Sequence, residues 1–188
     1  MYLRWMLLVL SVVLQAGAPT QSPATEDVAV WSAVVRHYSE SKPEHGAAPL
    51  IILAADTVPA SGITLGAVAR ERRIASELLE RLKQQNSSPR VVAGLSIPPS
   101  VTTLRGATEL IRRKTPNGFE TDWSVFQKRY PNSRLMQLSI PAYGDKVDKA
   151  VVYFWVGSGA EAAAGWVYVL EKEAGRWQVV LADQPWIA

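Results

Sequence analysis

The chain contains no cysteine among its 188 residues. Disulfide bonds, thiol chemistry, cysteine-ligated metals and lipid attachment through a cysteine are therefore excluded for this sequence. The fold has to be stabilised by its hydrophobic core. A chain of roughly 165 residues, as left after removal of a leader, is long enough to form one domain with such a core.

The sequence also lacks a large excess of charge of either sign. There are 20 Lys and Arg against 17 Asp and Glu, a formal net charge of +3, whereas a nucleic-acid-binding domain presents a concentrated basic face. Two basic clusters, at Arg70–Arg73 and Arg112–Lys114, stand near glutamates within predicted helices. Mixed charges of this kind are typical of a solvated helix face, so we expect no nucleic-acid partner.

Long apolar runs are missing as well. The longest one near the start, Trp5–Leu14 interrupted by Ser11, follows Arg4 and ends in the small residues Ala16–Ala18. A membrane-spanning helix needs about 20 apolar residues, whereas a short positive region, a short apolar region and a small-residue exit are typical of a signal peptide. We predict a cleavable signal peptide over residues 1–18, with cleavage after Ala18 or Ala24 and an uncleaved anchor as the alternative.

This prediction places the protein outside the cytoplasm, in the periplasm or the medium, with no stable membrane anchor after cleavage. Residues 19–26, rich in Pro, Ser and Thr, are expected to form a flexible tether. Residues 27–188 are then expected to form a single domain.

Hydrophobic periodicity predicts mainly helices in the first two thirds of that domain. Residues 27–39 and 66–85 have apolar side chains at helical spacing, and shorter helices are expected over 107–114 and 122–130. The apolar run at residues 50–55 and the stretch 90–95 are expected to be strands. Asn117-Gly118 is expected to form a turn.

The last third has the alternation of strands. Residues 136–142 alternate as in a half-buried strand, with Pro141 at its edge or end, and strands follow over 150–156, 165–171 and 176–181. Short glycine-containing links between them indicate hairpins. The predicted fold class is therefore α+β, with N-terminal helices packed on one face of a C-terminal antiparallel β-meander of about four strands.

The C-terminal part resembles a known group of sequences. Trp123-x-x-Phe126-x-x-x-Tyr130-Pro131-x-Ser133, followed later by Gly175-x-Trp177-x-Val179, is similar to a block at the end of uncharacterised exported bacterial proteins. The resemblance covers roughly residues 115–188 and implies export but no particular activity. Arg134 departs from this pattern, in which glycine usually follows the Tyr-Pro-x-Ser element. The last hairpin is also similar to that of nuclear-transport-factor-2-like domains, which are α+β cones with a pocket.

Few side chains suggest catalysis. His37 and His45 are eight residues apart and lack the spacing of a helical metal-binding pair. A site combining His45 with Glu44 and Asp56 can be drawn, but surface histidines are the simpler interpretation. No catalytic residue, metal or cofactor is assigned, and if the protein is an enzyme, Asp56 or His37 is the candidate base.

Two further motifs are better explained by turns than by chemistry. Gly157-Ser158-Gly159 is an incomplete nucleophile elbow and is expected to lie in a flexible hairpin loop over residues 157–165. The loop containing Asp145 and Asp148 alternates acidic and basic residues, which is typical of a solvated loop rather than a calcium site.

The aromatic residues are the most informative side chains. Tyr153 and Trp155 share one face of their strand, Trp166 and Tyr168 share one face of theirs, and Trp177 could extend an aromatic row across the sheet. Cross-strand core packing is the ordinary explanation of such residues. The alternative is a pocket for an apolar or sugar-like ligand, lined by these five residues.

Three classes of function remain open. The first is a non-enzymatic binding or interaction domain of the cell envelope, acting on a ligand or on an envelope protein. The second is a small pocket enzyme with a cone-like fold, and the third is a structural homodimer. Burial of Asp56 or His37 in a pocket would favour the enzyme. An aromatic face open to solvent would favour the binding domain, and an aromatic face paired with that of a second copy would favour the dimer.

Overall fold

The computed structural model describes residues 25–41, 50–59, 61, 63, 65 and 74–188. The predicted signal peptide, most of the tether, and His45 with Glu44 lie outside these residues. Helix α1 begins at Thr25, two residues before the expected start of the domain, so the end of the predicted tether is helical. No helix in the described part has the length and apolar character that crossing a membrane requires.

The described elements alternate between helices and strands before ending in three long strands. Their order is α1 (Thr25–Glu40), β1 (Leu50–Ala54), α3 (Ser76–Gln85), β2 (Val101–Leu104), η2 (Glu109–Ile111), β3 (Arg112–Thr115), β4 (Gly118–Thr121), α4 (Trp123–Arg129), β5 (Ser133–Leu138), β6 (Ala142–Tyr143), β7 (Lys149–Gly159), β8 (Ala162–Glu173) and β9 (Arg176–Ile187).

Seven of these strands form one mixed sheet in the order β2-β1-β5-β7-β8-β9, with β6 paired to β7. Strand β1 is parallel to both β2 and β5, whereas β5, β7, β8 and β9 are successively antiparallel. The α+β class and the C-terminal antiparallel meander are confirmed. The sheet as a whole is larger than the expected four strands, because β1 and β2 extend it by parallel pairing through intervening helices and loops.

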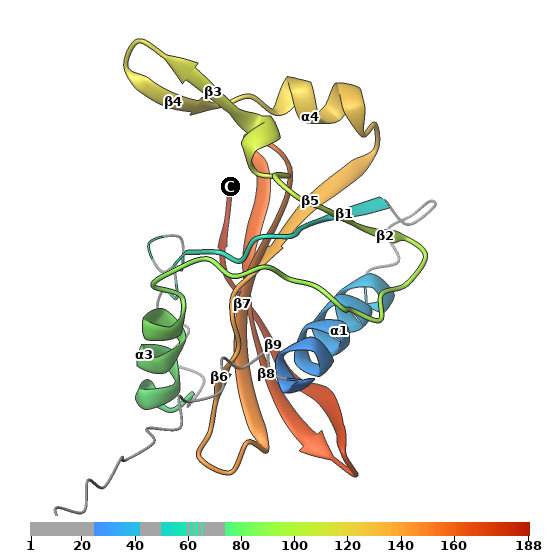
Figure 1. Cartoon of the computed structure of the whole chain (residues 1–188), viewed down its shortest axis with the longest axis vertical. Helices are drawn as coiled ribbons and strands as arrows, with labels where there is room; N and C mark the ends of the chain where they lie inside the picture. The colour runs from blue at the N-terminus through green and yellow to red at the C-terminus, as the bar shows by residue number, and fades with distance from the viewer. Residues whose placement is uncertain (1–24, 42–49, 60, 62, 64, 66–73) are drawn as a thin grey trace, which may run out of the picture.

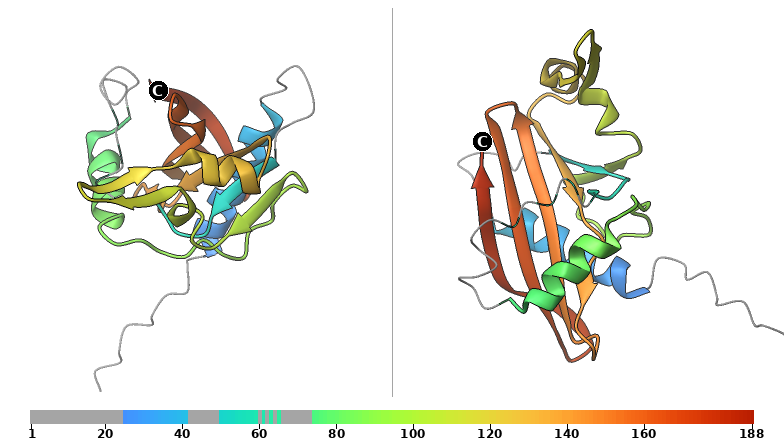
Figure 2. Two further views of the ribbon diagram at one scale, coloured as in Figure 1. Left: turned by 90° about the horizontal axis from the view of Figure 1, so that it is seen from above. Right: turned by 90° about the vertical axis from the view of Figure 1, so that its left-hand side faces the viewer.

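Helices cover both faces of this sheet, not one as predicted. Helix α1 packs on one face, whereas α3 and the segment from η2 to α4 pack on the other (Figures 1 and 2). The strand residues explain this arrangement, because β7 is apolar at consecutive positions and both of its faces need cover.

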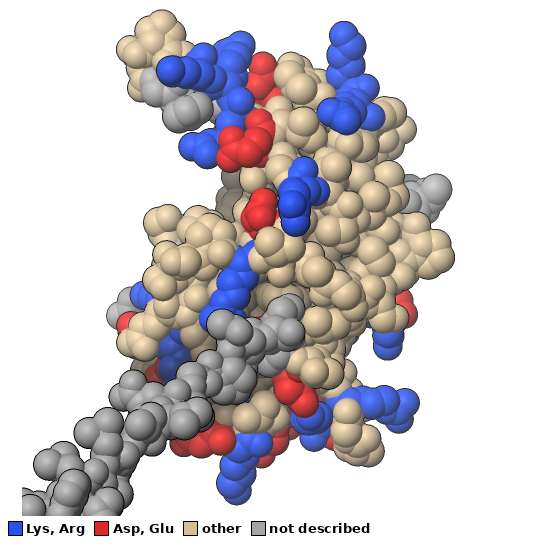
Figure 3. All heavy atoms as spheres, in the orientation of Figure 1, with Lys and Arg blue, Asp and Glu red and all other residues tan. Residues whose placement is uncertain are grey.

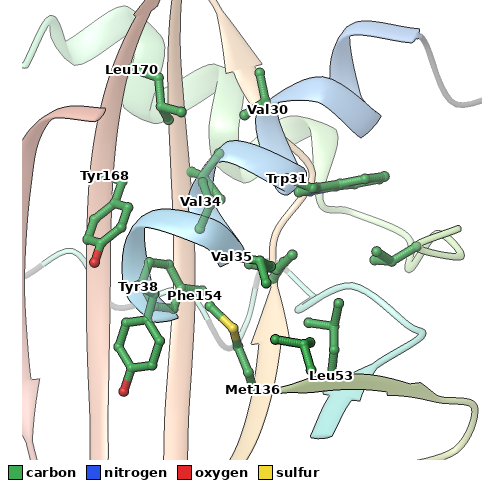
Figure 4. Close-up of a cluster of buried hydrophobic side chains, with 14 of the residues drawn as sticks. Val30, Trp31, Val34, Val35, Tyr38, Leu53, Met136, Phe154, Tyr168 and Leu170 are labelled. Carbon is green, nitrogen blue, oxygen red and sulfur yellow. The ribbon is translucent and has the colours of Figure 1, made fainter. Parts of the chain in front are cut away.

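The face under α1 contains the largest group of buried side chains. Val30, Trp31, Val34, Val35 and Tyr38 of α1 are directed at the sheet, in agreement with the helical spacing of apolar side chains predicted over residues 27–39 (Figure 4). This group packs on sheet residues that include Leu53, Met136, Leu138, Val152, Phe154, Tyr168, Leu170 and Trp177.

The opposite face has two smaller groups of buried side chains. Leu79 and Leu82 of α3 pack against Val151 and Tyr153 of β7. Nearer the β7–β8 turn, Phe126 of α4 is fully buried in a group that includes Ile52, Ala54, Ala107, Ile111 and Leu135.

Polar side chains are also buried in and just after β5, where the sequence suggested a half-buried strand. Gln137 and Ser139 are 7% and 0% exposed. The Gln137 amide donates to the Asp56 carbonyl, and Ser139 Oγ accepts from the Tyr153 N–H. The prediction that these residues face solvent is wrong because helices cover the second face and the polar groups find partners inside the protein.

Local predictions near residue 110 fail for a related reason. The expected helix over 107–114 is a single 3-10 turn followed by β3, which pairs with β4 through a turn at Pro116-Asn117, one residue before the predicted Asn117-Gly118 turn, because Gly118 already pairs with Thr115. Pro116 disfavours a helical conformation at Thr115, and an eight-residue helix is weak in water. Arg112–Lys114 therefore lie on a hairpin and not on a helix face.

The remaining boundaries differ by smaller amounts. Of the predicted helix over 66–85, the structure shows Ser76–Gln85, and residues 66–73 lie outside the described part. The predicted strand over 90–95 reduces to one bridge between Val91 and Asp56. Strands β7 and β8 continue through most of the expected loop over 157–165, leaving the turn at Ala160 and Glu161.

Candidate functional site

A pocket of about 280 Å³ opens beside the β7–β8 turn, on the face of the sheet that α1 covers. Its wall includes Tyr38 from the last turns of α1 and Trp166 from β8, whose ring centroids lie 6.2 Å apart. Arg134 of β5 and Glu161 of the turn also line it. The other lining residues are Val156, Gly157, Ser158, Ala162, Ala163, Ala164, Ile187 and Ala188.

The pocket exists because the strands are longer than the helix that covers them. Helix α1 ends at Glu40, whereas β7 and β8 continue to Gly159 and from Ala162. Beyond the helix the sheet presents small residues, among them Ala164, which is in register with Val156. Small side chains on a stretch of sheet that none of the described helices covers leave a hollow that Tyr38 and Trp166 border with aromatic rings.

The two aromatic rings of the wall are held by the core. Tyr38 is 5% exposed and packs edge-on against Phe154 at a centroid distance of 5.6 Å (Figure 4). Trp166 stacks beside Phe154, with an interplanar angle of 14° at 6.4 Å. The wall is therefore rigid, while Trp166 itself stays partly exposed toward the hollow.

Hydrogen bonds also fix the turn side of the pocket. The Gln127 side chain of α4 donates to the carbonyl of Ser158 at 2.7 Å. Ser158 itself lies in strand β7 and not in the flexible loop that the Gly-Ser-Gly motif suggested. A strand residue of this kind lacks the sharp strand-to-helix turn of a nucleophile elbow.

The five aromatic residues predicted to line a site do not form one row. Phe154 is in register with Trp166, and Val152 with Tyr168. Directly paired residues share a face, so Trp166 and Tyr168 lie with even-numbered β7 residues under α1. Tyr153 and Trp155 lie on the opposite face, which makes the prediction of a single aromatic row wrong.

Two of the five residues are part of that opposite face. Tyr153 is 1% exposed, and its hydroxyl accepts from Trp186 Nε1 at 3.1 Å. Trp155 donates from Nε1 to Gln137 Oε1 at 3.0 Å and packs edge-on against Trp123. Among the five predicted aromatics, Trp166 is the one that lines the pocket.

Trp177 lies under α1 at the other end of the sheet, in a polar network. Its Nε1 donates to Glu26 Oε2 at 2.7 Å, and Lys172 Nζ pairs with Glu26 Oε1 at 2.6 Å. The Lys172 hydrogen bond, followed by that from Trp177, holds the pKa of Glu26 below its ordinary value. This network fastens the start of α1 to β8 and β9.

A second contact fastens the same helix end. The Tyr143 hydroxyl donates to Asp27 Oδ1 at 2.6 Å, and Asp27 is 3% exposed. Burial raises the pKa of Asp27, partly offset by the Tyr143 hydrogen bond and the charge of Arg90. Burial and the neighbouring Asp27 also raise the pKa of Tyr143 far above its ordinary range.

The residues proposed as a base lie away from the pocket. The His37 ring contacts Tyr168 edge-on at 5.3 Å, and both His37 and Asp56 are partly exposed. Asp56 uses its backbone to bridge Val91. Within the described ranges no three His, Asp or Glu side chains are grouped closely enough to hold a metal.

No protein-family model, no curated protein and no solved structure matches this chain. The resemblance to exported bacterial proteins and to cone-like domains stays a prediction.

Sequence reasoning missed three of the four main pocket residues. Tyr38 was assigned to a helix stripe, and Glu161 to a loop. Arg134 is a departure from the resembling group, and its place in a strand was outside the strand predicted over 136–142.

Proposed function

We propose that this protein is an exported, non-enzymatic binding domain that holds a small apolar or sugar-like ligand in the pocket beside the β7–β8 turn. The observation that carries the proposal is a hollow of about 280 Å³ with Trp166 and Tyr38 on its wall and Arg134 and Glu161 among its lining residues. Small-molecule sites combine apolar or aromatic walls with a few polar groups in this way.

The size of the pocket restricts the ligand. Small-molecule sites range from about 300 to 1,000 Å³, and this pocket, at about 280 Å³, is slightly smaller than that range. A single ring fits better than an extended chain. A ring with an apolar face and polar edges, as in a sugar, can stack on Trp166 while its edges reach the polar lining residues.

The arrangement supports binding better than the two alternatives. The candidate bases His37 and Asp56 do not line the pocket. The predicted aromatic residues are divided between two helix-covered faces, so they do not offer one flat surface to a second copy. Export rests on the pattern of residues 1–18.

The test is native mass spectrometry of the mature protein from its own source, followed by titration with small sugars monitored by tryptophan fluorescence. Two variants change the pocket: Trp166→Ala removes its aromatic wall, and Ala164→Leu fills it. Ala182→Leu is the matched control, because Ala182 is an exposed alanine of β9 outside the pocket.

We expect a retained small mass, or a saturable fluorescence change, in the wild type and in Ala182→Leu but not in the two pocket variants. A bare wild-type mass together with no response to any sugar would contradict the proposal. Binding that survives in Ala164→Leu would place the ligand elsewhere.

A further inference from the structure

One end of the molecule is formed by a hairpin and a short helix. The β3–β4 hairpin and α4 lie in a line across this end, beyond the edge of the main sheet, and appear from above as one elongated bar (Figures 1 and 2). Strands β3 and β4 pair only with each other among the described strands. We refer to residues 105–132 as the hairpin–helix end.

The positive charge of the chain is concentrated there. Residues 105–132 carry six Lys and Arg against three Asp and Glu, whereas the rest of the chain carries 14 against 14. Figure 3 shows Lys and Arg gathered over the hairpin and over α4. The exposed cations of this end are Arg105, Arg112, Arg113, Lys114, Lys128 and Arg129.

Acidic neighbours offset only part of this charge. Arg112 pairs with Glu109 at 3.0 Å and Arg113 with Asp122 at 3.6 Å. In the described part of the chain, no ion pair involves Arg105, Lys114 or Lys128. The end therefore keeps a net positive charge that the fold does not use.

Helix α4 adds an apolar side chain among these cations. Its inner side is held to the body by buried Phe126 and by the Gln127 hydrogen bond to Ser158. Its outer side presents Val125, which is 47% exposed, with Lys128 and Arg129 three and four residues further on. Residues at these spacings are neighbours on a helix surface.

We propose that the hairpin–helix end docks this protein on a membrane surface rich in anionic phospholipid. A bilayer is a plane, and the hairpin and α4 form a bar that can lie along it. Lys and Arg attract anionic headgroups, and an apolar side chain flanked by cations can enter the interface between headgroups and acyl chains. The contact is peripheral and reversible, because a few cations and one valine bind weakly.

The test is flotation of the full chain with vesicles of phosphatidylcholine alone or mixed with phosphatidylglycerol. We expect binding to the mixed vesicles only, weakening as salt rises because the attraction between the charges is screened. Each surface cation contributes about fivefold to affinity, so Lys128→Glu with Arg129→Glu should reduce binding at least about tenfold. Val125→Ser should weaken binding to the mixed vesicles but leave the salt dependence of that binding unchanged.

The matched control reverses two charges at the opposite end. Lys146→Glu with Arg176→Glu changes an exposed residue of the β6–β7 turn and the exposed first residue of β9, and it alters the net charge equally. We expect it to bind anionic vesicles nearly as well as the wild type. Ala164→Leu, which fills the pocket, should also bind normally, which separates this proposal from the proposed ligand site.

Two outcomes would overturn membrane docking. Equal loss in both charge-reversed pairs would mean that binding follows net charge and not this end. Retention on a soluble polyanion such as heparin, with no flotation on either vesicle, would instead assign the surface to an anionic polymer. Circular dichroism of each variant establishes that it is folded before binding is compared.

Discussion

The indole of Trp186 occupies the space that a side chain would need at Gly165. The two residues are in register across β8 and β9, and a Cβ on Gly165 would stand 2.0 Å from Trp186 Nε1. The same indole donates to the hydroxyl of Tyr153. An aromatic ring lying over a glycine of the neighbouring strand protects the backbone of a sheet near its edge.

This contact predicts that Gly165→Ala is destabilising. Because the new methyl group would overlap the indole, Trp186 has to move and lose its hydrogen bond to Tyr153, at a cost of about 1–3 kcal/mol. The free energy of unfolding in urea measures this. Gly159→Ala in the same hairpin is the control, since its Cβ would meet Ala162 at an ordinary 3.8 Å. Equal effects of the two substitutions would contradict the account.

The hydrogen bonds of Asn86 lead to a second prediction about the free energy of unfolding. Asn86 is fully buried and bonds the Leu82 carbonyl, the Ile140 carbonyl and the Ile140 N–H, which fixes the end of α3 to the segment after β5. Asn86→Ala leaves these buried groups unpaired and should lower the free energy of unfolding by about 2–3 kcal/mol. Gln85→Ala, at an exposed position, should change it by less than about 0.5 kcal/mol. A small effect of Asn86→Ala would mean that water replaces the amide.

Glu26 predicts a loss of stability in acid. Its pKa is lowered in the folded protein by Lys172 and Trp177. A lowered pKa gives stability that is present above the unfolded pKa and lost as pH falls through the folded pKa. Because Glu26 and Lys172 are partly exposed, Glu26→Gln should cost only about 0.5–1 kcal/mol at pH 7. The difference in the free energy of unfolding between Glu26→Gln and the wild type should disappear on acidification. A difference that does not change with pH would contradict the ion pair.

Asp27, the next residue, predicts the opposite pH dependence. Its pKa is raised, chiefly by burial. A raised pKa gives stability that is present below the unfolded pKa and lost as pH rises through the folded pKa. Asp27→Asn keeps an acceptor for Tyr143 without the buried charge, so its stability relative to wild type should increase from acid to neutral pH. Urea unfolding at several pH values checks this, and a relative decrease would show that the Arg90 charge outweighs burial.

Local structure was predictable where one signal dominated. The apolar stripe of α1, the hairpin signal around Asn117 and the Gly175 link between β8 and β9 each specify an element through neighbouring residues alone. The helix expected over 107–114 failed because Pro116 and Asn117, just after it, form the turn of a hairpin. The excess of positive charge over residues 105–132 was also present in the sequence, but a helical interpretation of Arg112–Lys114 concealed it.

The sequence by itself determined that Tyr153 and Trp155 share a face, and that Trp166 and Tyr168 share one, because side chains alternate along any strand. Only the tertiary structure decided that these two pairs lie on opposite faces. The register of β7 with β8 sets this, and a slip of one residue would reverse it. The parallel pairing of β1, the burial of Gln137 and the pocket at Trp166 likewise depend on contacts between distant segments. No local pattern encodes such contacts, because they follow from which surfaces pack together when the whole chain folds.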